Sequence, residues 1–245
     1  LFALAPVRRH VAFNRARLDK RVTSVKWFEW LLLAALLLVF AGQALLGSPQ
    51  KSASFDEQYH LTAGYSYLRT GDFRLATTHP PLAGMVAALP LLGWEGINLP
   101  LDNPLWEQGN RYDFSDVFLW QANSDPQGML VAARRPITAL GVLLLIGLFF
   151  WARRLLGAAG GWLVLLPAVF DPNLVANSRI ISTDLPLTAL FVLAAWRLWC
   201  WLEGASIVGR ASSPTWPPIA SGKLVGLLAR PTSSTQRRKD AKTQR

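Results

Sequence analysis

The run from Trp27 to Gly47 limits the fold of this chain more than any other feature. Its only charged side chain is Glu29, which lies near one end. An apolar run of about 20 residues matches the roughly 30 Å hydrocarbon core of a bilayer. The run is too long and starts too far from residue 1 for a typical signal peptide. It therefore predicts a transmembrane helix that stays in the protein.

The rest of the sequence continues this pattern. Hydrophobic residues make up 51% of the 245 residues and charged residues only 16%, which argues against a soluble chain. Three further apolar segments follow, the second of them interrupted by Asp171 and Pro172. We expect an all-α polytopic membrane protein with a membrane domain over 27–202. Its four predicted spans are about 27–47, 137–156, 158–176 and 185–202.

The distribution of charge predicts the orientation of these spans. Residues 1–26 carry seven Lys or Arg against one Asp, and residues 203–245 carry eight against two acids. Residues 48–136 carry six Lys or Arg against nine Asp or Glu. Basic ends and an acidic loop predict a cytoplasmic N-terminus and a long extracytoplasmic loop over 48–136. We expect a multi-pass protein of the plasma (inner) membrane, with Arg153 and Arg154 on the cytoplasmic side, where they can snorkel to the interface.

Other features narrow the function. The net charge of +10 is explained by orientation and anionic lipid, so no nucleic-acid partner is expected. The tail 203–245 is rich in Ser, Thr, Pro and basic residues, which predicts disorder. Cys200 is the single cysteine and lies in an apolar run, which favours a packing role over redox chemistry. The stretch 80–94 is too short to span and begins with two prolines, which predicts an interfacial or re-entrant helix.

The extracytoplasmic loop begins with an unusually polar stretch, "FDEQYHLTAGYSYLRTGDFRLATTHPPL". A helix that ends at Gly71 would place Asp56 and His60 four residues apart on one face, with Glu57 beside them. Acids in the first turn of a helix are also favoured by its dipole, so Asp56 and Glu57 can equally be ordinary N-terminal residues. Spacing alone does not separate these interpretations.

Three kinds of chemistry could use this stretch. A carboxylate could act as a general base on an acceptor hydroxyl. A divalent cation could be held by acids and imidazoles, for which the candidates are Asp56, Glu57, His60 and His79. Arg69 or Arg74 could hold a phosphate, although each could equally be an anchor at the membrane interface. Whether a cofactor is used stays open, with a divalent cation as the candidate.

Two motifs in this order resemble polytopic glycosyltransferases of the GT-C type. The first is an Asp-Glu pair after the first span, followed by an aromatic helix, "GD" and "HPPL"; the second is "NSRIISTDLPLTALFVLAAW", residues 177–196. The protein O-mannosyltransferases are similar, as are the bacterial aminoarabinose-transferase-like and rhizobial lipopolysaccharide-core transferases. The resemblance covers about residues 27–202 and implies a GT-C-like fold.

The resemblance also implies a reaction. A sugar would move from a polyprenyl-phosphate donor to a hydroxyl of a lipid, glycan or protein acceptor at the outer membrane surface. Asp56 matches the catalytic acid and Glu57 its partner, while Arg179 and Asp184 match the second motif. An ion pair between Arg179 and Asp184 is an equally good explanation of those two residues. His79, Pro80 and Pro81 match the segment that shapes the site.

The sequence departs from the family in length. Members have many more spans, whereas after Glu203 this chain continues into a Ser-, Pro- and Arg-rich tail. We therefore expect an N-terminal fragment that is inactive alone. The alternative function is a transporter or a non-catalytic membrane protein, for which charged residues inside the spans would be expected to line a path.

Overall fold

The computed structural model describes residues 26–75 and 79–211, which form helices joined by loops, with no strand among them. The predicted segment 1–26 lies outside the described residues except for Lys26. The longer helices are α2 (Trp27–Gly47), α3 (Phe55–Thr70), α7 (Pro126–Leu156), α8 (Ala158–Val169) and α10 (Asp184–Ala211). The short elements are α4 (Leu82–Ala88), the 3-10 helix η1 (Leu89–Gly93), α5 (Pro104–Glu107), α6 (Arg111–Asp116), the π-helical turn η2 (Val117–Gln121) and α9 (Pro172–Asn177).

The chain divides into two units after Arg197. The first unit contains the elements up to the first half of α10, and the arrangement given below is that of this unit. The described part of the second unit is the continuation of α10 from Leu198 to Ala211. Because α10 runs to Ala211, the first residues of the predicted tail 203–245 are helical, and the remainder of that tail lies outside the described residues.

Three described helices are long and apolar enough to cross a membrane: α2, α7 and the part of α10 from Asp184 to Glu203. The all-helical, membrane-type architecture predicted from the sequence is therefore present. The predicted span 158–176 is not one helix. It is divided into α8, which has only 12 residues, and α9. The division falls at Asp171, whose side chain accepts a hydrogen bond from the backbone N–H of Leu174 (2.8 Å) and so begins a new helix.

Helix α7 begins earlier than its predicted span at 137. Asp125 caps it by accepting a hydrogen bond from the backbone N–H of Gly128 at 2.8 Å, and the helix continues through Pro136 to Leu156. The sequence Arg134-Arg135-Pro136 resembles the polar end of a span, which is why the boundary was predicted there. The predicted loop 48–136 thus ends in a helix that is continuous with the span.

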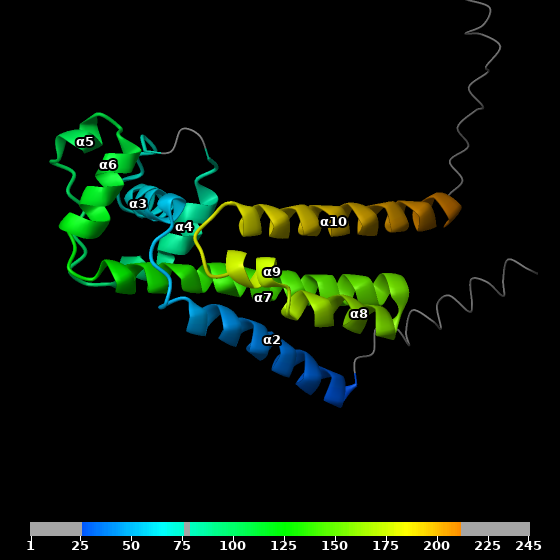
Figure 1. Ribbon diagram of the computed structural model, residues 1–245. Helices are drawn as coiled ribbons and strands as arrows, with labels where there is room; N and C mark the ends of the chain where they lie inside the picture. The colour runs from blue at the N-terminus through cyan, green and yellow to red at the C-terminus, as the bar shows by residue number, and fades with distance from the viewer. Residues whose placement is uncertain (1–25, 76–78, 212–245) are drawn as a thin grey trace, which may run out of the picture. The chain divides into compact units, whose positions relative to one another are not determined.

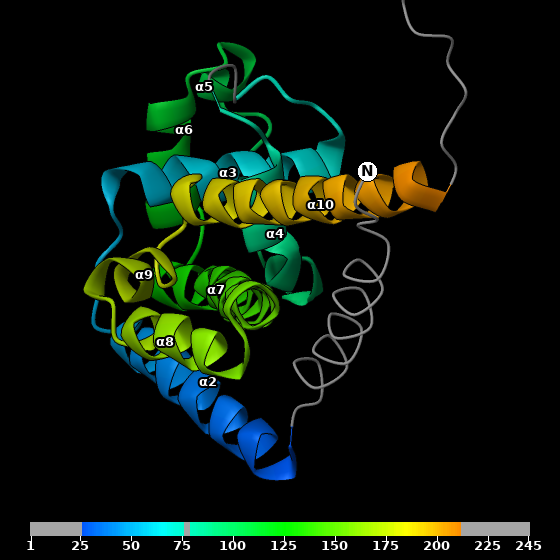
Figure 2. The ribbon, with the colours of Figure 1, turned by 90° about the vertical axis from the view of Figure 1, so that its right-hand side faces the viewer.

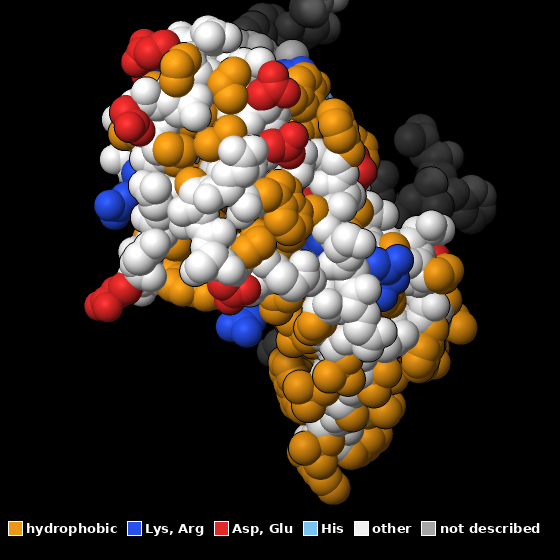
Figure 3. All heavy atoms as spheres, turned by 60° about the vertical axis from the view of Figure 1, so that its left-hand side comes forward, with side chains coloured by type: hydrophobic (Ala, Val, Ile, Leu, Met, Phe, Trp, Pro, Cys, Tyr) orange, Lys and Arg blue, Asp and Glu red, His pale blue; other side chains and the backbone are white. Residues whose placement is uncertain are grey.

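The segment between α2 and α7 lies at one end of the long helices. In Figures 1 and 2, α3, α4, α5 and α6 gather at the end where α7 and α10 begin and α2 finishes. Figure 3 shows Asp and Glu side chains over this region and hydrophobic side chains over the part that extends from it. The exposed hydrophobic side chains of the long helices include Leu31, Leu38, Leu143 and Leu163. Such a surface suits contact with lipid.

We call this end of the molecule, which contains α3, α4, α5 and α6, the polar end. A buried ion pair joins it to α7. Arg134, which is fully buried in α7, donates from Nε and Nη2 to the two carboxylate oxygens of Glu57 in α3, at 2.8 and 2.7 Å. Its guanidinium also donates to the carbonyl oxygens of Ser48, Lys51 and Ser52, at 2.8, 3.0 and 3.1 Å. The two-point contact and the three carbonyls satisfy all of the guanidinium's donor groups, as a buried arginine requires.

Glu57 is equally well satisfied. Its carboxylate accepts from the backbone N–H of Ser54 at 2.9 Å and from that of Ile181 at 2.9 Å, in addition to Arg134. The bond to Ser54 begins α3, whereas the bond to Ile181 reaches the loop before α10. A single carboxylate thereby joins α3, α7 and the start of α10.

Helix α3 has the ends that the sequence predicts. Gly71 stops it in the left-handed conformation, with φ of 73°, and its N–H bonds to the carbonyl of Tyr67. In its middle, α3 crosses α4 so closely that a Cβ added at Gly64 would collide with the backbone of Gly84. A Cβ at Gly84 would in turn meet the carbonyl oxygen of His60. The stretch 80–94 predicted as a helix is α4 with η1, and it packs on α3 through these glycines.

A second ion pair lies at the other end of α2 and α7. Arg153 of α7 donates to the carboxylate of Glu29 at 3.0 and 3.2 Å, and both residues are buried. Glu29 also accepts from the backbone N–H of Lys26 at 2.8 Å and from the indole of Trp162 at 3.4 Å. The expectation that Arg153 points to the membrane interface is therefore wrong, because Glu29 draws its side chain inward. Arg154 is exposed.

Replacing Arg134 with Met should lower the free energy of unfolding by about 3–5 kcal/mol, because Glu57 would be left buried without its partner. Thermal unfolding followed by circular dichroism in detergent measures this. Replacing both Arg134 and Glu57 with Met should cost less than the single change. Arg69→Met removes an exposed arginine and serves as the control. Equal melting temperatures for Arg134→Met and Arg69→Met would contradict the role of the pair.

Gly64→Ala should lower the free energy of unfolding by about 1–3 kcal/mol, since the added methyl group forces α3 and α4 apart. The matched control is Gly42→Ala in α2, where an added Cβ meets nothing within 4 Å. The control should be neutral or slightly stabilising, because Ala favours a helix over Gly. Both are measured as melting temperatures, and a Gly64→Ala variant as stable as Gly42→Ala would refute the close approach.

Candidate functional site

Four segments bring polar and aromatic side chains together at the polar end. Helix α3 supplies Asp56, Tyr59 and His60, and the turn before α4 supplies His79. Helix α6 supplies Arg111 and Tyr112, and α10 supplies its first residue, Asp184. We call these seven residues the His60 cluster. Figure 2 shows α3, α6 and the start of α10 at this end of the molecule. The Glu57–Arg134 pair fixes α3 relative to the start of α10, because Glu57 also accepts the N–H of Ile181.

Three rings form the centre of the His60 cluster. The rings of Tyr59 and His60 lie 4.3 Å apart, and the ring of His79 approaches that of His60 edge-on at 5.3 Å. Tyr59 and His79 are stacked at 6.2 Å. Tyr59 and His60 are buried, whereas His79 is exposed. The cluster therefore has a buried floor and an imidazole at its surface.

A guanidinium lies beside these rings. The Arg111 guanidinium is 5.6 Å from the ring of Tyr59 and 4.6 Å from that of Tyr112. Phe55 stacks on the outer side of Tyr112 at 5.3 Å. Arg111 Nη2 also donates a hydrogen bond to the Tyr112 hydroxyl at 2.7 Å. Contacts of this kind hold an arginine in place. The cluster thus combines a fixed positive charge with imidazole and carboxylate groups.

Burial and charge set the protonation of His60. Burial is the largest cause that lowers the pKa of this imidazole, followed by the neighbouring His79 and then by Arg111. Asp56 and Asp184 act in the opposite direction and raise it. These five groups therefore lie within electrostatic reach of one another, and His60 is held as the neutral imidazole near pH 7. A neutral imidazole can accept a proton or a hydrogen bond.

Asp56 is one of two exposed carboxylates in the cluster, and Asp184 is the other. Asp56 lies within electrostatic reach of the Tyr59 hydroxyl, and the pKa of that phenol is raised first by burial and then by Asp56. An exposed carboxylate positioned by a neighbouring side chain can accept a proton from an incoming hydroxyl. Asp56 therefore has the access that its predicted role requires.

Glu57, the predicted partner of Asp56, has a different environment. It is fully buried, and its carboxylate oxygens are engaged by Arg134 and by two backbone N–H groups. A substrate or a metal ion at Glu57 would have to displace these contacts, which is costly for a buried charge pair. We therefore assign Glu57 a positioning role in place of the catalytic and metal-ligand roles expected from the sequence.

The His-Pro-Pro segment, residues 79–81, leads from the His60 cluster into α4. His79 enters the His60 cluster, and Pro81 caps the N-terminus of α4, where a preceding proline restricts the chain. Pro80 and Pro81 are exposed. The segment turns the chain from the cluster into α4, whose position is fixed by the crossing with α3.

The two arginines considered for phosphate binding do not join the cluster. Arg74 forms ion pairs with Asp72 at 2.7 Å and with Glu107 at 3.2 Å, and its guanidinium lies 4.8 Å from the ring of Trp106. Its hydrogen bond to Asp72 lowers the pKa of that carboxyl and raises the pKa of Arg74 itself. Arg69 is exposed in the last turn of α3. Both are at the end of α3 opposite Asp56.

The two site residues of the second motif, Arg179 and Asp184, lie in different places. Asp184 lies within electrostatic reach of His60 and raises its pKa, whereas the Arg179 side chain packs against Gly47 at the end of α2. Among the described residues no ion pair joins Arg179 to Asp184, so the simplest alternative for these two residues is not formed. Among the described residues, no ring contact and no ion pair joins Arg179 to the His60 cluster.

The metal candidates are not arranged as a set of ligands. Over residues 26–75 and 79–211, no three His, Cys, Asp or Glu side chains form a group that could hold a metal ion. Of the four candidates, Glu57 is occupied by Arg134, and the rings of His60 and His79 meet edge to face. The residues present therefore do not fit a bound cation in this arrangement.

Sequence reasoning did not identify Arg111, Tyr112 or Tyr59 as site residues. Arg111 and Tyr112 lie more than 50 residues after Asp56 in a polar stretch without useful periodicity. The only local sign was Asn110, a good N-cap residue, whose side chain accepts from the backbone N–H of Asp113. Their placement over Tyr59 depends on how α6 packs on α3.

Comparison with known proteins adds no assignment. No family model, no curated protein and no solved structure matches this chain. The function is therefore argued from the site itself.

Replacing Arg111 with Gln should raise the pKa of His60, because one cause of its depression is removed. Since the folded pKa lies below the unfolded value, the unfolded chain binds more protons below about pH 6.5, and stability falls as the pH is lowered. Arg111→Gln should reduce this loss. The imidazole C–H resonances titrated by NMR, with melting temperatures at pH 7.5 and 5.0, measure both effects.

The control is Arg69→Gln, which removes an exposed arginine at the other end of α3. It should leave the pKa of His60 unchanged. A pKa that moves equally in both variants would show that net charge, and not contact with Arg111, sets the protonation of His60.

Proposed function

We propose that this protein is a membrane glycosyltransferase that moves a sugar from a polyprenyl-phosphate donor to an acceptor hydroxyl on the extracytoplasmic side. The observation that carries the proposal is the His60 cluster. It places a solvent-facing carboxylate, Asp56, beside a fixed cation, Arg111, at the polar end of apolar helices. The resemblance of the Asp-Glu and His-Pro-Pro motifs to GT-C enzymes supports the same function.

In the proposed reaction, the acceptor hydroxyl attacks the anomeric carbon of the sugar. The new bond joins the acceptor oxygen to that carbon, and the bond from the carbon to the phosphate oxygen breaks with inversion. Asp56 takes the proton of the hydroxyl, and the lipid phosphate leaves with the electron pair. In this proposal the positive charge of Arg111 and a hydrogen bond from His79 stabilise the departing phosphate, whose charge grows in the transition state.

An apolar cavity supports a lipid-linked donor. It has a volume of about 280 Å³ and lies between α4, α7 and α10. Leu82 and Pro186, which line one part of it, are close in sequence to His79 and Asp184 of the cluster, and Gly147 and Trp196 line the part further along the spans. Cavities of roughly 300 Å³ are common for ligand sites. An isoprenoid chain in this cavity would leave its phosphate near the cluster.

The remaining motif residues have supporting roles in this proposal. Glu57 positions α3, and His79 with the two prolines forms the wall beside α4. Asp184 influences His60, while Arg179 is at the end of α2. Arg69 and Arg74 do not take part. The acceptor is a lipid, glycan or protein hydroxyl, and no step is assigned to a metal ion.

The location follows from the charge pattern of the sequence. Basic terminal segments and the acidic stretch 48–136 support a multi-pass protein of the plasma (inner) membrane with its N-terminus in the cytoplasm. The His60 cluster is then extracytoplasmic, where lipid-linked sugars are the available donors. The contacts of Glu29 and Arg153 bear on the transporter alternative, because charges that line a path would be expected to face a cavity. This pair is buried against Trp162 instead.

Asp56→Asn should abolish transfer, with a loss of at least about 100-fold, which is the lower range for a general base. Because this chain alone is expected to be inactive, membranes that contain a full-length version of the protein are incubated with a panel of radiolabelled polyprenyl-phosphate sugars, and label in the acceptor fraction is counted. The matched control is Asp102→Asn, an exposed acid outside the His60 cluster. Undiminished transfer by Asp56→Asn would remove Asp56 from the mechanism. Failure of every donor with the unaltered protein would favour the transporter or non-catalytic alternative.

A further inference from the structure

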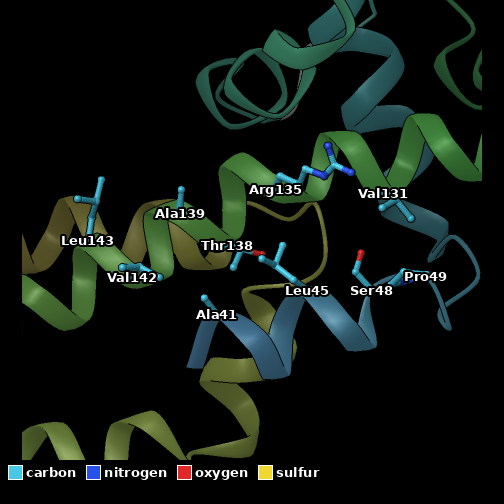
Figure 4. Close-up of a pocket in the computed structure, with 10 residues that line it drawn as sticks. All are labelled: Ala41, Leu45, Ser48, Pro49, Val131, Arg135, Thr138, Ala139, Val142 and Leu143. Carbon is cyan, nitrogen blue, oxygen red and sulfur yellow. The ribbon is translucent and has the colours of Figure 1, made fainter. Parts of the chain in front are cut away.

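A second apolar groove lies on a different side of α7, between α7 and α2. It has a volume of about 690 Å³, and its lining is almost entirely hydrophobic. The groove is lined by Ala41 and Leu45 of α2 and by Ala139, Val142 and Leu143 of α7, all of which are labelled in Figure 4. None of its lining residues belongs to the His60 cluster, so the groove is independent of the proposed reaction.

Three polar side chains line this groove, and all of them lie toward the polar end. They are Ser48, which follows α2, Thr138 and Arg135 of α7. Arg135 is exposed, and none of the ion pairs formed by the described residues involves it. From Arg135 to Leu143 the helix rises by about 12 Å. The groove therefore has a cation near one end and a long apolar wall below it.

Ser48 adds an independent indication of a ligand. Its side chain is only 1% exposed, and its hydroxyl has no hydrogen-bond partner in the structure. A buried hydroxyl without a partner is costly, so a ligand atom that accepts its hydrogen bond would be favoured. The position of Ser48 is fixed, because its carbonyl accepts from Arg134 at 2.8 Å. Figure 4 shows the hydroxyl directed into the space between α2 and α7.

We propose that this groove binds an anionic phospholipid of the surrounding bilayer, with its phosphate at Arg135 and Ser48 and one acyl chain between α2 and α7. The chemistry of the groove favours this occupant, since a phosphate is matched by a cation and a hydroxyl, and an acyl chain by the apolar wall. The end of α2 and the start of the apolar part of α7 lie where phosphate groups meet the hydrocarbon core. A helix of a second copy would leave Arg135 and Ser48 without an anionic partner.

The lipid would also act as a structural part of the protein. Further along the spans, α2 meets α7 mainly through Phe40, Leu145 and Phe149. Toward the end of α2 the groove lies between the two helices, with Leu45 and Ser48 on the α2 side and Val131 and Thr138 on the α7 side. A chain that fills it would replace missing contacts between them, so binding should raise the melting temperature.

The experiment compares phosphatidylglycerol with phosphatidylcholine. The detergent-purified full-length chain is titrated with each lipid, and bound lipid is measured by native mass spectrometry together with the melting temperature. Phosphatidylglycerol should bind about fivefold more tightly, which is the effect expected for one arginine beside an anionic lipid. Arg135→Gln should remove this preference, and Ser48→Ala should weaken phosphatidylglycerol binding. Lys51→Gln removes an exposed cation near the same end of α2 that does not line the groove, and it should leave the preference intact.

Ala139→Trp tests whether the groove itself is the site. Ala139 is exposed and lines the groove, so a larger side chain should block it without disturbing the core. This variant should lose the lipid-dependent rise in melting temperature while it melts like the unaltered chain without lipid. A photoreactive phosphatidylglycerol should label peptides from α2 and α7 in the unaltered chain, but not in Ala139→Trp.

Several results would overturn the proposal. Equal binding of the two phospholipids would do so, as would an equal effect of Arg135→Gln and Lys51→Gln. Tighter binding of a polyprenyl phosphate, with displacement of phosphatidylglycerol, would assign the groove to that lipid instead. A change of oligomeric state in Ala139→Trp, with lipid binding unaltered, would assign it to a second copy of the chain. None of these results depends on whether sugar transfer occurs.

Discussion

The arrangement of this protein depends on one buried ion pair, between Glu57 and Arg134. The pair joins α3 to α7. The other hydrogen bonds of Glu57 and Arg134 hold residues 48–54 and Ile181. Burying two charges is tolerated only when every donor and acceptor is satisfied, and here backbone groups from two segments complete the set. Because α3 carries Asp56, Tyr59 and His60, the same pair also determines where the candidate site lies.

The cavity proposed for the donor and the groove proposed for the phospholipid are connected to this ion pair in different ways. The cavity between α4, α7 and α10 is next to elements that Glu57 holds together, and the proposed donor chain occupies it. The groove between α2 and α7 ends at Ser48, whose carbonyl is bound by Arg134. One arginine therefore supports the outer ends of both grooves. The adjacent Arg135 faces outward, so two successive arginines have separate roles, one internal and one toward lipid.

Much of the helical architecture could be predicted from local sequence. The run 27–47, the capping of α3 by its first-turn acids and its end at Gly71 are decided by hydrophobicity, helix dipole and the left-handed preference of glycine. The span 158–176 was predicted as one helix because apolar content hides a break, whereas Asp171 capping Leu174 divides it. Helices α5 and α6 were not predicted, since they are short and depend on packing for stability.

The sequence by itself determined that this is a helical chain with membrane-type segments and that Asp56, Glu57, His60 and His79 lie in one polar stretch. Only the tertiary structure decided which of these residues are buried and which face solvent. Glu57 is turned inward because Arg134, which is 77 residues away in the chain, needs a buried partner, and Asp56 next to it is left facing solvent. Arg111 joins the site through packing of α6 on α3. Contacts between distant residues leave no periodic trace in sequence, so neither pairing could be derived from spacing alone.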